Sequence, residues 1–205
     1  MRDDDLRLAG LLCAKVCHDL VSPVGAIGNG LEILRPDAPP DPEEYALLVD
    51  AARDATATLR FLRLAFGVGA SEAETLSMRE VRSVVDGRLA RERHVFSWPD
   101  GDGEIARPAA RMLMLSVLTA AAATPRGAEV VVAPVRTDPL HLRVEATGPT
   151  TRLPPDAGRL LADPGAVPPT AREAQYALLA RLAEAEGARA AVAADDSRVT
   201  ITISA

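Results

Sequence analysis

Two long apolar stripes at helical spacing, separated by a proline-rich turn, constrain the first third of the chain more than any other feature. The first stripe runs from about Leu6 to Leu34, and its apolar residues recur in steps of three and four. Residues with this spacing share one face of an amphipathic helix. The stripe therefore predicts a long helix whose apolar face packs against other helices. Its members are Leu6, Ala9, Cys13, Val16, Leu20, Val24, Ile27, Leu31 and Leu34.

A second helix is predicted directly after a tight turn at Arg35–Pro40. Asp41 is suited to be its N-cap and Pro42 to occupy its first turn. Its apolar stripe is Tyr45, Leu48, Ala52, Ala55, Leu59, Leu62 and Phe66. Two such helices form an antiparallel hairpin, which leaves much of the apolar surface in water. A four-helix bundle made by two chains solves this problem, so we expect a homodimer.

A histidine lies on the outer face of the first predicted helix. If Cys13 takes heptad position a, Leu20 is the next a, and His18 falls at position f, which points to water. A neutral imidazole is a competent nucleophile near neutral pH. Asp19 follows at once and would hold one ring nitrogen as N–H, which leaves the other nitrogen to attack phosphorus. The pattern predicts a nucleophilic site centred on His18.

Ser22 and Lys15 lie about one turn from this pair and complete the candidate catalytic set. Ser22 either offers its hydroxyl to phosphate or water, or fills space beside Pro23. Lys15 either neutralises phosphate charge or is a solvated residue that serves docking. Pro23 has no N–H, which predicts a bend in the helix beside the nucleophile. His94 and His141 have no such neighbours and are predicted to be ordinary histidines exposed to solvent.

Composition and charge exclude several classes of function. The 205 residues carry a formal net charge of −6 with a pI near 5.1 and contain no block of Lys or Arg, so we expect no nucleic-acid partner. The start, MRDDDLRLAG, is acidic and unlike a signal peptide, and we expect no membrane segment. Cys13 and Cys17 lie one helical turn apart, where a disulfide between them is geometrically unfavourable. The simplest expectation is a cytoplasmic protein.

Beyond Gly67-Val68-Gly69-Ala70-Ser71 the pattern changes to alternating short elements, which divides the chain into residues 1–70 and 71–205. Helices are predicted at residues 80–91, 107–123 and 171–186, and strands at 94–97, 129–135, 140–146, 188–193 and 198–204. Residues 148–169 are predicted to form a loop. The order predicts an α+β sandwich, with one mixed sheet covered by helices.

The residues around His18 carry a resemblance to a known family. His18-Asp19-Leu20-x-Ser22-Pro23 resembles the H-box of sensor histidine kinases, whose pattern is His-(Glu/Asp)-Leu-x-x-Pro. The longer run LAGLLCAKVCHDLVSPVGAIGNGLEIL, Leu8–Leu34, is similar to the ChpT-type histidine phosphotransferases of bacterial phosphorelays. In that family a dimeric phosphoacceptor hairpin precedes a degenerate domain related to the histidine-kinase ATPase. The resemblance implies the same two parts here.

At the positions that would bind nucleotide in such an ATPase domain, this chain has other residues than the kinases. The Asn positions that contact Mg²⁺ and phosphate correspond to Leu115 and Thr119, and a hydrocarbon cannot ligate Mg²⁺. The adenine-reading Asp corresponds to Ala146, and the second Gly of the same box to Thr150. The Gly-rich box corresponds to residues 168–174, PPTAREA, which offer no flexible run of backbone N–H groups for phosphates. We therefore expect a nucleotide site that has been lost.

The resemblance implies a histidine phosphotransferase of a bacterial two-component phosphorelay, in which His18 takes phosphate from a receiver aspartate and passes it to a response-regulator aspartate. The implied partners are the receiver domain of a hybrid histidine kinase and CtrA- and CpdR-like response regulators. Mg²⁺ is expected in the receiver, and no cofactor, metal or ATP on this chain. Two alternatives remain open. One is a non-catalytic receiver-binding module that does not need His18, and the other is an ATP-dependent histidine kinase.

Overall fold

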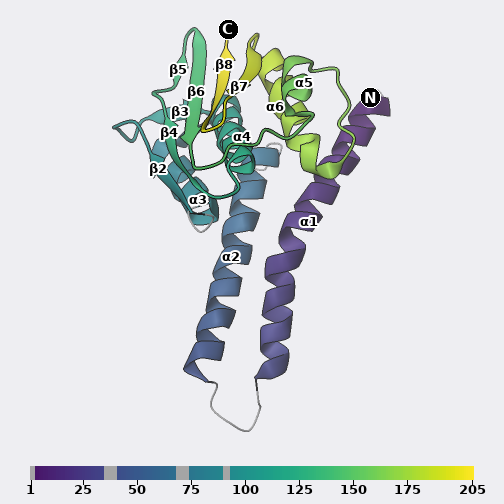
Figure 1. The fold of residues 1–205 in the computed structure, drawn as a ribbon, viewed down its shortest axis with the longest axis vertical. Helices are drawn as coiled ribbons and strands as arrows, with labels where there is room; N and C mark the ends of the chain where they lie inside the picture. The colour runs from purple at the N-terminus through teal and green to yellow at the C-terminus, as the bar shows by residue number, and fades with distance from the viewer. Residues whose placement is uncertain (1–2, 35–40, 68–73, 90–92) are drawn as a thin grey trace.

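Two long helices project as a hairpin from one end of an α+β domain (Figure 1). The computed structural model describes residues 3–34, 41–67, 74–89 and 93–205. Helix α1 spans Asp3–Ile33, and α2 spans Pro42–Phe66 in the opposite direction. Both predicted helices are therefore confirmed, whereas the predicted turn at residues 35–40 lies outside the described residues.

Local sequence explains where α2 begins and how α1 starts. Asp41 caps α2, because its side chain accepts a hydrogen bond of 2.8 Å from the backbone N–H of Glu43. Asp3, Asp4 and Asp5 occupy the first turn of α1, where carboxylates favour the helix dipole. The helix continues through Pro23 to Ile33. The predicted bend beside Pro23 stays a prediction.

The hairpin leaves large apolar side chains in water. Gly30 of α1 approaches α2 so closely that a Cβ there would lie 3.1 Å from Cδ1 of Leu48. The apolar surface of α1 is wider than this contact, and part of it has no cover from the same chain. The exposed large apolar residues of the two helices are Leu6, Val21, Val24, Leu31, Ile33, Tyr45, Leu47 and Leu59. Such a surface is typical of an interaction site.

By length and composition alone α1 is apolar enough to cross a membrane, which the sequence analysis did not expect. This is weak evidence for a span, because helices of other kinds near an N-terminus pass the same test. The middle of α1 carries Lys15, His18 and Asp19, and the helix packs along α2.

The domain that follows contains two sheets and several helices. Its elements are β1 (Thr75–Ser77), α3 (Met78–Leu89), β2 (His94–Ser97), β3 (Glu104–Ala106), α4 (Arg107–Ala123), β4 (Ala128–Val132), β5 (Arg136–Thr137), β6 (Leu140–Thr147), α5 (Ala157–Ala162), η2 (Ala171–Glu173), α6 (Ala174–Ala185), β7 (Arg189–Ala194) and β8 (Arg198–Ser204). The larger sheet has the order β2-β4-β6-β8-β7, with β5 beside β6. Strands β2 and β4 are parallel, and the other pairs are antiparallel. The predicted mixed sheet is confirmed.

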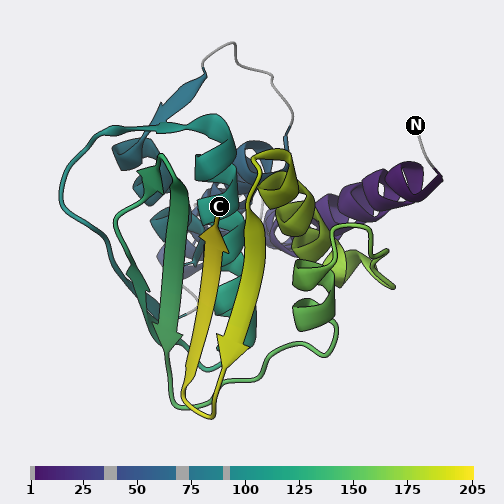
Figure 2. The ribbon, with the colours of Figure 1, turned by 90° about the horizontal axis from the view of Figure 1, so that it is seen from above.

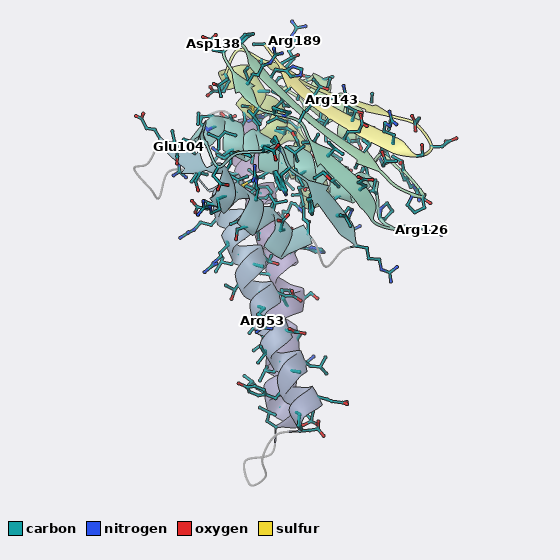
Figure 3. The ribbon with its side chains drawn as sticks, turned by 90° about the vertical axis from the view of Figure 1, so that its left-hand side faces the viewer. Arg53, Glu104, Arg126, Asp138, Arg143 and Arg189 are labelled. Atoms are coloured by element: carbon teal, nitrogen blue, oxygen red, sulfur yellow. The ribbon has the colours of Figure 1, made fainter. Side chains whose placement is uncertain are left out.

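Helices cover one face of the larger sheet and leave the other face open (Figures 1 and 2). Alternate residues of β6 and β8 point into the core and are fully buried, among them Val144 and Ile201. Their neighbours on the other face include Arg143, which pairs with Glu145 at 2.7 Å and projects from the sheet in Figure 3. Helix α4 lies against the inner face and is buried along most of its length.

The predicted elements of this domain agree with the structure. Several short elements of the structure were not predicted. The bounds of α4, β2 and β8 match the prediction. Strand β4 ends at Val132 rather than at residue 135, because Pro134 has no N–H with which to continue the ladder. Helix α5 lies within residues 148–169, which were predicted to be loop. Strands β1, β3 and β5 were also missed, since each has only two or three residues.

The hairpin and the domain share one hydrophobic core. Leu8 of α1 and Phe61 of α2 belong to the same buried cluster as the residues of α4 and the sheet. Arg111 of α4 donates hydrogen bonds of 3.3 Å and 3.5 Å to the carbonyl oxygens of Ala65 and Phe66, at the end of α2. The predicted boundary near residue 70 falls outside the described residues, so the division into residues 1–70 and 71–205 stays a prediction.

Candidate functional site

His18 lies near the middle of α1 and is exposed, as its heptad position predicted. Its side chain is 66% exposed. Because α1 is a continuous helix on both sides of it, the backbone of His18 is held rigidly while its ring stays accessible. This arrangement suits a group that must meet another protein.

The carboxylate of Asp19 joins His18 to Lys15. Oδ1 of Asp19 lies 3.2 Å from Nδ1 of His18, and Oδ2 lies 3.0 Å from Nζ of Lys15. A carboxylate accepts hydrogen bonds, so this contact favours the tautomer with the proton on Nδ1. The lone pair then sits on Nε2, on the far side of the ring from Asp19. This geometry suits a nucleophilic role for Nε2.

The structure places the other two candidate residues differently from each other. Lys15 is only 11% exposed, and its ammonium is paired with Asp19, so it is not the solvated residue considered from the sequence. Ser22 is exposed on α1, one turn beyond His18. Their predicted roles toward phosphate stay predictions.

A cleft of about 660 Å³ opens beside His18, between α1 and the C-terminal domain. Residues of α1 form one wall, and the end of α4, the segment before η2 and the start of α6 form the others. The lining residues are Lys15, His18, Asp19, Arg88, Leu118, Ala121, Ala122, Pro154, Pro155, Thr170, Ala171, Arg172, Glu173, Gln175 and Tyr176.

Several of these residues were missed by the sequence analysis. Arg88, at the end of α3, and Arg172, in η2, bring cationic groups to the walls of the His18 cleft. Tyr176 is buried in the same region, and this burial raises the pKa of its phenol to about 12. These residues lie 70 or more positions from His18 in sequence, so that only the tertiary fold brings them to it.

A second groove, of about 580 Å³, adjoins the cleft along the hairpin. Ser22 and Pro23 of α1 line it together with residues of α2 and the end of α3. Asp19 and Arg88 line both hollows and mark the place where they meet. Ser22 thus faces the groove, whereas His18 faces the cleft. The complete lining is Asp19, Ser22, Pro23, Ala26, Leu47, Asp50, Ala51, Asp54, Ala57, Thr58, Gly87 and Arg88.

The other two histidines lie outside both hollows. The expectation that His94 is a solvated surface residue is wrong, because it is 4% exposed. Its Nε2 lies 3.0 Å from Oγ1 of Thr124, which itself donates to the carbonyl of Ala120. His94 therefore donates from Nε2 to the hydroxyl and helps to join β2 to the end of α4. His141 is half-buried on β6.

The positions that correspond to the nucleotide-binding boxes of kinases lie in packed surroundings. Leu115 and Thr119 of α4 are fully buried, and the Thr119 hydroxyl donates to the carbonyl of Leu115 at 2.8 Å. Ala146 of β6 is also fully buried. Helix α5 adds the buried side chains of Leu160 and Leu161 to the same core. Leu115 and Ala146 thus place hydrocarbon at two of the positions that the resemblance assigns to nucleotide binding, and the loss of the nucleotide site stays a prediction.

The fold and its relatives define a histidine phosphotransferase. Residues 78–198 match the family model described as the histidine phosphotransferase C-terminal domain. The chain belongs to the histidine phosphotransferase family. It is 34% identical, over 152 residues, to the protein phosphotransferase ChpT of Brucella abortus (strain 2308), with 73% of this chain and 72% of that protein covered.

A solved structure of a bacterial phosphotransferase is similar over nearly the whole chain. The TM-score is 0.80 at 30% identity, and the match covers 97% of this chain and 96% of the other. The Acinetobacter baumannii histidine kinase AdeS is more distant, at 14% identity and a TM-score of 0.48, over 91% of this chain and 95% of the other. The family assignment rests on the first match and on the relative from Brucella.

Proposed function

We propose that His18 is the phosphoryl carrier of this phosphotransferase, and that it exchanges the group with aspartates of receiver domains. The observation that carries the proposal is the exposed imidazole whose Nδ1 is held by Asp19 at 3.2 Å, beside an open cleft. The family supports a phosphorelay role for the chain. The exposure of His18 and its contact with Asp19 support this role.

In the proposed step, the lone pair of Nε2 attacks the phosphorus of a receiver phosphoaspartate in line. The N–P bond forms while the O–P bond to the aspartate breaks, and the aspartate leaves as a carboxylate. The proton on Nδ1 stays with the ring and its hydrogen bond to Asp19 strengthens as the ring gains cationic character. Return of the group to a second receiver reverses the same bonds. Alignment and charge neutralisation supply most of the catalysis.

We propose that cationic side chains of the cleft walls other than Lys15 neutralise the charge of the phosphoryl group. Lys15 is nearly buried and already paired with Asp19, so its main effect is to hold that carboxylate in place. Arg88 and Arg172 line the cleft and would attract the anionic phosphoryl group and the acidic pocket of a receiver. We place the Mg²⁺ required for transfer in that receiver pocket, because the Asp19 carboxylate is engaged by its two neighbours.

We further propose that the partners are the receiver domain of a hybrid histidine kinase and response regulators similar to CtrA and CpdR, in the cytoplasm. The two adjoining hollows support a docking mode in which a receiver contacts both the hairpin and the domain. The chain would act as a homodimer, since Val21, Val24 and Leu31 lie exposed on α1 and a second copy would bury them.

We propose that ATP has no site on this chain. The support is the burial of Leu115, Thr119 and Ala146 at positions that correspond to the nucleotide boxes. Calorimetric titration with a non-hydrolysable ATP analogue and Mg²⁺ tests this directly. We expect no heat of binding. Saturable binding at micromolar or millimolar analogue would contradict the proposal and revive the kinase alternative.

The transfer experiment uses the purified chain with receiver domains that carry a labelled phosphoryl group. Wild type and His18→Ala are mixed with each phosphorylated receiver, and separately with labelled ATP. We expect acid-labile label on the wild type from a receiver but not from ATP, and none on His18→Ala. His141→Ala is the matched control, because this residue lies half-buried on β6 and should accept label like the wild type.

Each of the other outcomes would indicate a different function for the chain. Label taken directly from ATP would make the chain a kinase. Label retained by His18→Ala would place the carrier elsewhere. Binding of a receiver without transfer of label would favour the non-catalytic module.

A further inference from the structure

The N-terminal end of α1 is attached to the far end of α6. Nη1 of Arg181 lies 2.7 Å from Oδ1 of Asp5, and Nε of the same guanidinium donates to the carbonyl of Pro164 at 3.1 Å. One side chain of α6 thus joins α1, α6 and the segment that follows α5. One turn farther along α1, Leu8 is 5% exposed and belongs to the domain core.

The two helices joined by this ion pair also form opposite walls of the His18 cleft. On α1, Asp5 and Leu8 anchor the helix, and His18 follows after 13 residues, or about 20 Å along the axis. On α6, Gln175 and Tyr176 line the cleft, and Arg181 makes the anchor. Figure 1 shows the N-terminal part of α1 beside α6, with the remainder of α1 extending away along α2.

A contact near one end of a rigid helix controls the position of the other parts of that helix. Helix α1 packs along α2 and also contacts η2 and α6. Without the Asp5–Arg181 pair the N-terminal part of α1 would be held less firmly on α6, and a small shift of α1 relative to α6 would displace His18 relative to the other walls. The width of the cleft would then vary. A partner that must contact both walls would bind only the fraction of molecules with a suitable width, which lowers its apparent affinity.

We propose that Arg181 is a positioning residue that sets the width of the His18 cleft through Asp5 and so acts on receiver docking. The proposal rests on the proposed function and adds to it a residue that touches neither the phosphoryl group nor His18. Since the side chains of Arg181 and Asp5 are 24% and 42% exposed, the pair adds little to global stability. We expect the pair to affect the affinity of the chain for the receiver.

The test measures transfer from a phosphorylated receiver over a range of receiver concentrations. For Arg181→Gln and for Asp5→Asn we expect the half-saturating concentration to rise about three- to tenfold, with an unchanged maximal rate. The spontaneous hydrolysis of phosphorylated His18 should also stay unchanged, because the Asp19 contact is untouched. The double charge reversal Asp5→Arg, Arg181→Asp should recover most of the loss, and Arg181→Lys part of it.

Arg143→Gln is the matched control. Arg143 pairs with Glu145 at 2.7 Å on the outer face of the larger sheet, away from both hollows, and Figure 3 shows it there. Removal of that pair should leave the half-saturating concentration unchanged. Equal half-saturation in wild type and both Arg181 and Asp5 variants would overturn the proposal, as would a fall in maximal rate alone. If the wild type takes no phosphate but binds the receiver, the proposed function fails, and the same variants compared by receiver affinity still decide the role of Arg181.

Discussion

The ammonium of Lys15 lies 3.0 Å from Oδ2 of Asp19, which makes the lysine a partner of the carboxylate rather than of an incoming phosphate. The other oxygen of Asp19 faces His18. Both side chains of the ion pair are largely buried, so the carboxylate has a fixed orientation when the receiver arrives. His18, the proposed nucleophile, would thereby be oriented before a complex forms.

Asp19→Asn should lower the maximal rate of transfer from a receiver about 100-fold, because an amide neither fixes the tautomer of His18 nor stabilises its developing charge. Single-turnover transfer at saturating receiver checks this. Asp138→Asn is the control, since Asp138 is exposed between β5 and β6 and lines neither hollow. An Asp19→Asn rate within threefold of wild type would remove Asp19 from the mechanism.

Lys15→Gln should have a smaller effect, about tenfold or less, because the carboxylate remains and loses only its orientation and charge balance. The same single-turnover assay separates two roles of the lysine. A loss as large as that of Asp19→Asn would show that Lys15 contacts the phosphoryl group itself.

Val24→Glu should convert the proposed dimer to a monomer. Val24 is 55% exposed on α1, and a carboxylate buried at a two-fold interface would face its own copy at high energetic cost. Sedimentation equilibrium gives the mass directly. Val95→Glu is the control, because Val95 is 67% exposed on β2, outside the hairpin. A wild-type chain that sediments as a monomer at all concentrations would exclude the homodimer.

Ionisation of Tyr176 should be delayed to high pH. Burial raises its pKa from 10.0 to about 12, so the native state holds this proton over a range in which the unfolded chain releases it. The resulting stability is fully present below pH 10 and is lost as the pH rises toward about 12. Tyr176→Phe should show a flatter decline in this range. Ultraviolet titration of Tyr45→Phe, which leaves Tyr176 as the remaining tyrosine, measures the pKa itself. A titration midpoint near pH 10 would contradict the burial of the Tyr176 phenol.

Leu160→Ala should lower the free energy of unfolding by about 2–5 kcal/mol, since Leu160 is fully buried and the substitution leaves a cavity under α5. Denaturant unfolding monitored by circular dichroism checks this. Arg159→Ala, its largely exposed neighbour, should change the stability by less than about 1 kcal/mol. A similar loss in both variants would mean that α5 does not contribute a packed core.

The long elements of the fold could be predicted because their signals are local and repeated. The stripes of α1 and α2, the cap at Asp41 and the periodicity of α4 each appear in the sequence itself. Helix α5 has six residues between Pro- and Gly-bearing segments, too few for a periodic pattern, and it exists because Leu160 and Leu161 are buried by other elements.

The candidate site likewise has one part that could be predicted from the sequence and another that could not. The contact of Asp19 with Lys15 joins residues four positions apart, which helical geometry brings together. The contact of Asp19 with His18 joins neighbours in sequence and was predicted from the motif. The cleft does not follow from sequence, because Arg88, Arg172 and Tyr176 reach it from three separate elements. His94 was placed at the surface because nothing local indicates its partner, Thr124, which lies 30 residues away.

The bonds from Arg111 to the last carbonyls of α2 have an evolutionary consequence. The last carbonyl oxygens of α2 accept hydrogen bonds from a side chain of the neighbouring domain rather than from the hairpin itself. A gene fusion that kept this hairpin and exchanged the domain would lose these hydrogen bonds unless the new domain supplied a donor at the same place. The two parts are therefore expected to be inherited as one unit, with a side chain that can donate kept at residue 111.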